Sequence, residues 1–225
     1  MTILNATLTD TTFILSQDEA HVTPGGAFVA HAPKVITSPA RRYIAGSAGN
    51  VSFSGALGTL LDRLPVLNAD RIGAELRVLP DAHPDQLAVV GWWCDASARP
   101  VAYAFQAQNG FTPVPLEAGR GHVISPAEAW IEDHAGMLKA SQAAVLGNQT
   151  EAFHVRLARA QKEAAKRGLI NKPGWRPHSI GGRLHIARLD RQGVIANAVP
   201  VFGPEGFTSV GDVLAARWVR HPAAA

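Results

Sequence analysis

Two runs of β-branched and apolar residues near the start of the chain constrain the fold more than any other feature. They cover residues 2–9 and 11–16, and the polar Asp10 separates them. This composition predicts two strands around a polar turn, with Gln17 and Asp18 delivered at the end of the second strand. The first elements of the fold should therefore be a pair of strands.

Further strands and helices follow in blocks. Residues 42–49 are an apolar segment that runs into small residues, which predicts a strand followed by a turn. Ser125, directly before Pro126, predicts a helix cap. Apolar spacing and end signals predict helices over four segments: 53–64, 70–79, 125 to about 144, and 150–167 with Gly168 closing the last one.

The order of these elements predicts the fold class. Strands, a helix pair, strands, a second helix pair and strands are typical of an α+β fold in which helices cover two packed sheets. We therefore expect a four-layer αββα sandwich with antiparallel sheets. At 225 residues, 47% hydrophobic and 17% charged, the chain can bury one full core. We expect a single domain over residues 1–222 and a frayed tail over 223–225.

Cysteine usage and hydropathy bear on the compartment. Cys94 is the only cysteine, so no internal disulfide can form, which agrees with a reducing compartment. Its neighbours Trp92 and Trp93 favour a buried core position for the thiol. No apolar run approaches the roughly 20 residues of a membrane-spanning helix, and no basic segment precedes an apolar one at the start of the sequence. We therefore expect a cytoplasmic protein.

Thr2, Asp18 and Lys34 follow one another at equal intervals. A threonine hydroxyl is a weak nucleophile and needs a general base, and the free α-amine of the same residue can serve once Met1 is removed. A buried lysine beside that amine would lower its pKa from roughly 8 by like-charge repulsion, and a carboxylate would keep the lysine charged. The three residues are therefore a candidate nucleophile, electrostatic partner and orienting group.

The sequence around these residues carries a family resemblance. Lys34 opens a Lys-Val-Ile run, and an Ile-Ala-Gly-Ser-Ala-Gly run ends at Gly49. With no gap from Thr2 to Gly49, this segment resembles the N-terminal half of proteasome-type β subunits and of the bacterial HslV peptidase, which are N-terminal-nucleophile hydrolases. The rest of the chain resembles the family more loosely, in a hairpin over 87–105, the helix over 150–167 and a strand pair over 181–194.

The resemblance implies a function and a set of site residues. It implies a threonine protease or amidohydrolase with the catalytic residues Thr2, Asp18, Lys34, Gly46, Ser125 and Ser179. Backbone N–H groups from Gly46 to Ser47 would stabilise the oxyanion, and the missing side chain of Gly46 would leave an open pocket below it. The implied substrate pocket comprises His21, Val22, Ala32, Val35 and Gly46. Because proteasome-type subunits assemble into rings, the resemblance also implies a homo-oligomer and an unfolding ATPase as partner.

Several departures from the family pattern leave a second hypothesis open. Ile3 stands where the family usually has a small hydroxyl residue, no Asp closely precedes Ser179, and the glycines expected beside Ser125 are missing. If Met1 stays in place, the Thr2 nitrogen is an amide and cannot act as a base. The alternative is a catalytically inactive copy of the fold that serves as a structural or accessory component of a larger assembly, such as a virion.

Two further patterns bear on partners and cofactors. Residues 156–191 hold ten lysines and arginines against Glu163 and Asp190. Without aromatic residues interleaved along a groove, this segment favours a solvated surface over a nucleic-acid-binding face. The nine histidines form no HExxH or His-x-His pattern, and the sequence has no CxxC pair. We therefore expect neither a metal nor a cofactor.

Overall fold

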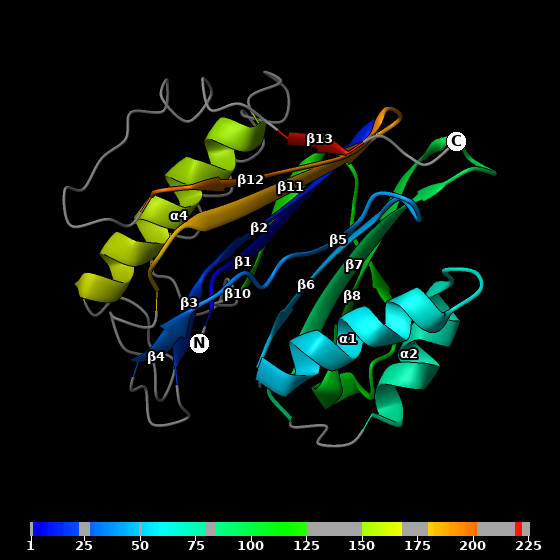
Figure 1. Ribbon diagram of the computed structural model, residues 1–225, viewed down its shortest axis with the longest axis horizontal. Helices are drawn as coiled ribbons and strands as arrows, with labels where there is room; N and C mark the ends of the chain where they lie inside the picture. The colour runs from blue at the N-terminus through cyan, green and yellow to red at the C-terminus, as the bar shows by residue number, and fades with distance from the viewer. Residues whose placement is uncertain are drawn as a thin grey trace.

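The computed structural model describes residues 2–22, 28–49, 51–79, 84–125, 150–167, 180–201 and 219–221. The fold is mixed α+β, with two larger β-sheets, a small two-stranded sheet and few helices (Figure 1). Every strand pair among the described residues is antiparallel. The prediction of an α+β fold with antiparallel sheets is confirmed at this level.

The first sheet contains the N-terminal hairpin. Its described strands are, in spatial order, β10 (Arg120–Ser125), β1 (Leu4–Leu8), β2 (Thr12–Asp18), β11 (Leu184–Asp190), β12 (Gly193–Val199) and β13 (Val219–His221). The second sheet has the order β5 (Ile36–Ser38), β6 (Tyr43–Ala48), β7 (Leu87–Cys94), β8 (Arg99–Gln106) and β9 (Val114–Pro115). A short 3₁₀ helix, η1 (Ala107–Asn109), follows β8. The small sheet pairs β3 (Ala20–Val22) with β4 (Phe28–His31).

β1 is buried along its whole length because both of its faces are covered. Alternate side chains of a strand point to opposite faces of the sheet. On one face, Leu4, Ala6 and Leu8 belong to the same apolar cluster as Phe13 and Leu15 of β2. The second sheet contributes to this cluster through Ile44, Ala48, Leu87, Val89 and Ala102. The two sheets therefore pack face to face around a shared core.

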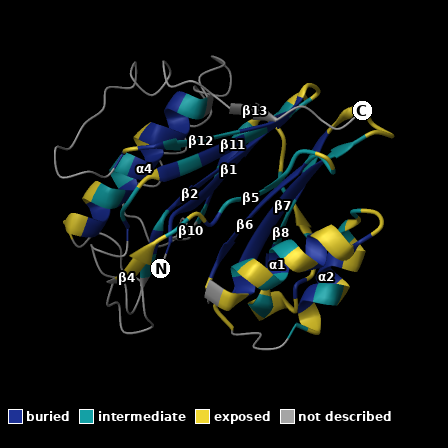
Figure 2. Cartoon of the chain, viewed as in Figure 1, coloured by how far each residue is buried: buried dark blue, intermediate teal, exposed yellow. Residues whose placement is uncertain are grey.

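Helices cover the other face of each sheet (Figure 1). α1 (Val51–Arg63) and α2 (Ala69–Arg77) pack on the second sheet, where Leu57 and Ile72 share a cluster with Tyr43 of β6. α4 (Thr150–Lys166) packs on the first sheet, where Val155 shares a cluster with Ile14 of β2. Figure 2 shows that α1 and α2 turn their buried residues toward the sheet and their exposed residues outward. The predicted helices over 53–64, 70–79 and 150–167 are confirmed to within a few residues.

A layer of buried polar side chains lies between the first sheet and α4. Thr7 Oγ1 lies 3.0 Å from His154 Nε2, and Ser16 Oγ lies 2.7 Å from Nδ1 of the same ring. Asn5 and Gln161 exchange two amide hydrogen bonds, of 2.8 and 3.1 Å. His154 is fully buried, and burial lowers its pKa to about 3. Because each of these side chains has a partner, the layer can position α4 on the sheet without leaving a polar group unpaired.

The prediction that Cys94 is a core residue is wrong. Cys94 is the last residue of β7 and is only half-buried, because the chain turns at residues 95–98 before β8 begins. Most of the helix predicted over 125–144 lies outside the described residues, as do Gly168 and the tail over 223–225. Ser125 is described as the last residue of strand β10.

Candidate active site

The hairpin of β1 and β2 brings Thr2 and Asp18 together. The two strands pair with Leu4 opposite Gln17, so the residues before Leu4 lie beside the end of β2. Asp18 is the last residue of β2, and Lys34 lies in the segment between β4 and β5. Three segments that are separate in the sequence therefore converge on one site.

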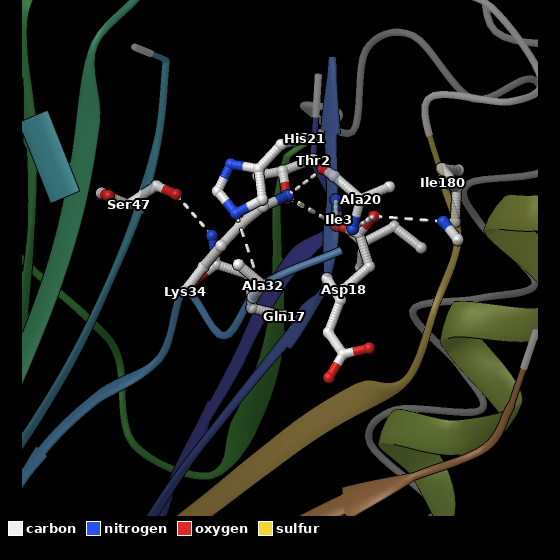
Figure 3. Close-up of polar contacts among 12 residues, drawn as sticks. Thr2, Ile3, Gln17, Asp18, Ala20, His21, Ala32, Lys34, Ser47 and Ile180 are labelled. Atoms are coloured by element: carbon white, nitrogen blue, oxygen red, sulfur yellow. Dashed lines mark hydrogen bonds and ion pairs between the residues drawn. The ribbon is translucent and has the colours of Figure 1, made fainter. Parts of the chain in front are cut away.

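Thr2 Oγ1 is held between a carboxylate and an amine (Figure 3). It donates a hydrogen bond to Asp18 Oδ1 over 2.5 Å and accepts one from Lys34 Nζ over 2.5 Å. Lys34 Nζ also donates to the backbone oxygen of Ala20 and lies 3.5 Å from Asp18 Oδ1. The exposed fractions are 4% for Thr2, 7% for Lys34 and 0% for Asp18. The hydroxyl is therefore fixed at a buried site, with its proton and a lone pair both directed.

The Asp18 carboxylate accepts hydrogen bonds at both oxygens. Oδ1 accepts from the Thr2 hydroxyl and from the N–H of Ile3, the latter over 2.8 Å. Oδ2 accepts from the N–H groups of Ala20 and Gly181, each over 3.3 Å. Hydrogen bonds to an ionised acceptor are stronger than those between neutral groups. The carboxylate is therefore locked in orientation, with one oxygen turned to Thr2 and Lys34.

Lys34 is an ammonium group in a site that disfavours charge. Burial lowers the pKa of Lys34, while the charge and hydrogen bonding of Asp18 oppose part of this shift. The neighbouring carboxylate thus favours the charged form that burial disfavours. The arrangement thus combines a positioned hydroxyl with an amine whose protonation is tuned by its surroundings.

Two residues of the predicted substrate pocket, His21 and Ala32, lie beside Lys34 (Figure 3). His21 Nε2 lies 3.3 Å from the backbone oxygen of Ala32, and burial, followed by the charge of Lys34, lowers the pKa of His21. Val35 is half-buried and packs against the core between the sheets. Val22 ends β3, and its side chain is not among those described.

The prediction of an open pocket below Gly46 is wrong. Gly46 lies in β6, opposite Val89 of β7. A Cβ at this residue would lie 2.7 Å from Leu15 Cδ2, 2.8 Å from Gln17 Oε1 and 2.9 Å from Leu4 Cδ1. The missing side chain makes room for the side chains of the first sheet, which approach the β6 backbone closely. Glycine at this position therefore serves the packing of one sheet on the other.

Of the two predicted serines, the structure describes only the backbone of Ser125. The backbone of Ser125 pairs with Leu4 at an irregular point of the β1–β10 ladder, and its side chain is not described. Ser179 lies outside the described residues, although Gly181, two residues later, donates to Asp18. The structure brings Thr2, Asp18 and Lys34 together, and the roles of the two serines stay predictions.

Lys162 is a residue near the site that sequence reasoning misses. It lies on α4 and donates a hydrogen bond to the backbone oxygen of Ile180, and the charge of Asp18 acts on it. In the sequence it stands in a basic run, with no pattern that separates it from its neighbours. Lys162 follows the apolar Val155 and Ala158 by seven and four residues, and this helical spacing is the one signal that places Lys162 on the sheet-facing side of α4.

No protein-family model matches this chain, and no curated protein sequence matches it either. Of the helices that the structure describes, none has both the length and the apolar character needed to cross a bilayer. Within the described ranges, His, Cys, Asp and Glu residues form no group of three or more that could hold a metal ion. The geometry around Thr2 is therefore the main structural indication of a function.

Proposed function

We propose that this protein is a threonine-type N-terminal-nucleophile hydrolase, similar to proteasome β subunits and the HslV peptidase. In this proposal the sheets and their covering helices form a four-layer αββα sandwich. The mature chain begins at Thr2 after removal of Met1, and the substrate is a peptide or amide bond. The observation that carries the proposal is the pair of 2.5 Å hydrogen bonds that hold Thr2 Oγ1 between Asp18 and Lys34.

The proposed reaction begins when Thr2 Oγ1 attacks the carbonyl carbon of the substrate. The hydroxyl turns its proton from Asp18 Oδ1 to the free α-amine of Thr2, which takes it directly or through a water, and the carbonyl π electrons move to oxygen to form an oxyanion. Collapse of this intermediate breaks the C–N bond, and the departing amine takes the proton from the α-ammonium. Water then attacks the resulting Thr2 ester with the same amine as base, which releases the acid and restores the hydroxyl.

Lys34 and Asp18 support this chemistry in different ways. The positive charge of Lys34 disfavours protonation of the nearby α-amine, which keeps that amine available as a base. The hydrogen bond from Lys34 Nζ stabilises the negative charge that develops on Thr2 Oγ1. Asp18 orients both partners and supplies the negative charge that opposes the loss of the Lys34 proton.

The backbone of β6 is the proposed oxyanion site. Strand β5 pairs with β6 only as far as Ala45, so among the described strands β6 has no neighbour on that side at Gly46 and Ser47. Gln17 Nε2 donates to the carbonyl oxygen of Ser47 over 2.5 Å, which places this edge beside the end of β2 (Figure 3). Backbone donors in a strand are fixed before the reaction, which is the condition for effective oxyanion stabilisation.

Assembly is the part of the proposal that depends on the family resemblance alone. We propose a cytoplasmic homo-oligomer, as in the rings of proteasome-type subunits, with an unfolding ATPase as partner for folded substrates. Light scattering coupled to size-exclusion chromatography tests whether the chain forms a homo-oligomer. A monomer at all concentrations would contradict it.

The test of the chemistry uses a chain that begins at Thr2, produced by cleaving a fusion partner directly before that residue. This chain is incubated with a peptide-like β-lactone, and the intact protein mass is measured. Attack by Thr2 Oγ1 opens the lactone ring, and the ring oxygen that leaves takes a proton. The protein should therefore gain the full mass of the lactone, and peptide mapping should locate the adduct on Thr2.

Matched variants separate the chemistry from folding. Thr2→Ala removes the hydroxyl, and a glycine added before Thr2 keeps the hydroxyl but converts the amine into an amide, so neither chain should form the adduct. Thr11→Ala changes an exposed threonine of the same hairpin and should react like the unsubstituted chain. A folded chain beginning at Thr2 that forms no adduct would contradict the proposal. That result would favour a structural role in a larger assembly.

A further inference from the structure

We propose that Lys162 is a positioning residue of the Thr2 site and acts on Asp18 through the peptide group that joins Ile180 to Gly181. The inference rests on the proposed function, because that function defines what is being positioned. Lys162 belongs to α4, on the side of the first sheet that is turned away from the second sheet. It is therefore a contribution from a different layer of the fold.

One planar peptide group connects Lys162 to Asp18. Lys162 Nζ donates to the carbonyl oxygen of Ile180, and the N–H of Gly181 donates to Asp18 Oδ2 over 3.3 Å. The carbonyl and this N–H belong to the same peptide unit, and in a trans peptide they point in opposite directions. A side chain that fixes the C=O bond therefore also fixes the direction of the N–H. Figure 3 shows the Ile180 backbone beside Asp18.

The charge of Lys162 strengthens the same contact. An ammonium group at the carbonyl end polarises the peptide unit, so its N–H presents more positive charge to the carboxylate. Burial lowers the pKa of Lys162, Lys166 lowers it further, and the charge of Asp18 opposes the shift. Ile180 is fully buried, which keeps the connection away from bulk water. Lys162 and Asp18 therefore interact across this peptide unit.

The hydrogen bond from Gly181 restrains the Asp18 carboxylate from outside the segment that contains Asp18. Among the residues that the structure describes, the other backbone donor to Oδ2 is Ala20, which follows Asp18 by two residues and moves with it. Gly181 belongs to the segment before β11, so it ties the carboxylate to a separate part of the fold. If the carboxylate rotates, Oδ1 shifts relative to Thr2 and Lys34. A displacement of about 1 Å at a reacting group can cost up to about a hundredfold in rate.

The first test compares Lys162→Met with Lys166→Met. Lys166 lies one turn later on α4, and its side chain is 58% exposed. Inactivation by the β-lactone yields a limiting rate constant and a half-saturating concentration for the chain that begins at Thr2. Lys162→Met should lower the limiting rate constant by about tenfold and leave the half-saturating concentration unchanged. Lys166→Met should change neither, and Lys162→Arg should restore most of the rate because it keeps the charge and the donor.

Hydrogen exchange at the Gly181 amide provides a readout that does not require catalysis. Lys162→Met should accelerate this exchange by about tenfold or more, and Lys166→Met should not. An unchanged limiting rate constant, or unchanged Gly181 exchange, in folded Lys162→Met would overturn the inference. Lys162→Gln takes its place if Lys162→Met does not fold.

The same experiments distinguish the failure of the inference from that of the proposed function. If the unsubstituted chain beginning at Thr2 forms no adduct, the proposed function fails. Exchange at Gly181 then decides by itself whether Lys162 holds this peptide group on Asp18. If the adduct forms equally fast with Lys162 or Met at this position, the function stands and the inference fails.

Discussion

Acid should destabilise this protein through His154. The ring is fully buried between the first sheet and α4, in contact with the hydroxyls of Thr7 and Ser16, and burial lowers its pKa from 6.5 to about 3. In the unfolded chain the same side chain titrates near its ordinary value of about 6.5. Between these two values the unfolded state binds more protons than the folded state. The free energy of unfolding should therefore fall as the pH is lowered through this window.

The size of the effect follows from the two pKa values. Each pH unit inside the window corresponds to about 1.4 kcal/mol. Lowering the pH from 7.5 to 5.0 crosses about 1.5 units of the window, so His154 alone should remove about 2 kcal/mol from the free energy of unfolding. Above about pH 7 the contribution of His154 should be constant, because the ring is then largely neutral in both states.

Urea unfolding followed by tryptophan fluorescence at the two pH values measures this loss, with His154→Gln measured in parallel. Other titrating groups, such as Glu19, contribute to both proteins. The difference between the two pH-induced changes therefore isolates His154. A difference below about 0.5 kcal/mol would refute the reasoning, since the ring would then be accepting its proton in the folded state.

Three further sets of substitutions test the packing and the site. Gly46→Ala should lower the free energy of unfolding by about 1–3 kcal/mol, because the new Cβ would overlap two leucine side chains and a glutamine; an unchanged urea midpoint would contradict the close approach of the sheets. Asn5→Leu and Gln161→Leu should each cost about 1–3 kcal/mol by leaving a buried amide unpaired. Their double variant should cost clearly less than the sum, and additive losses would show that the amides do not interact. Asp18→Asn should cost about 3–5 kcal/mol because Lys34 loses its buried counter-ion. That loss should shrink as the pH rises from the folded-state pKa of Lys34 in Asp18→Asn to its higher folded-state pKa in the unsubstituted chain, and a loss independent of pH would contradict the pairing.

The strands and helices that could be predicted are those with local patterns. The two β-branched runs form β1 and β2. The segments with helical spacing of apolar residues form α1, α2 and α4, and each element lies within a few residues of its predicted bounds. The proximity of Thr2 and Asp18 follows from the same patterns, because an antiparallel pair joined by a short turn places its two outer ends side by side. This part of the site is therefore encoded within a short stretch of the chain.

The contacts between layers could not be predicted, because they join residues with no shared local pattern. A glycine in a strand indicates that something approaches the backbone closely but does not identify it, and at Gly46 it is the first sheet rather than open space. Ser16 and His154 meet only when α4 docks on that sheet. The contact of Lys162 with Ile180 depends on the same docking.

Under the proposed function, the buried Asp18–Lys34 pair serves the chemistry of Thr2 rather than stability. Taking two ions out of water costs several kcal/mol for each, and their attraction at 3.5 Å offsets this only when further hydrogen bonds are present. Two apolar side chains of similar volume could hold the same strand ends together without that cost. Unlike apolar side chains, the ions fix a hydroxyl, since Thr2 Oγ1 directs its proton at one ion and a lone pair at the other. A hydroxyl held in place before any substrate binds becomes a nucleophile once its proton turns from Asp18 to a base. Under the proposed function, that base is the α-amine set free when Met1 is removed.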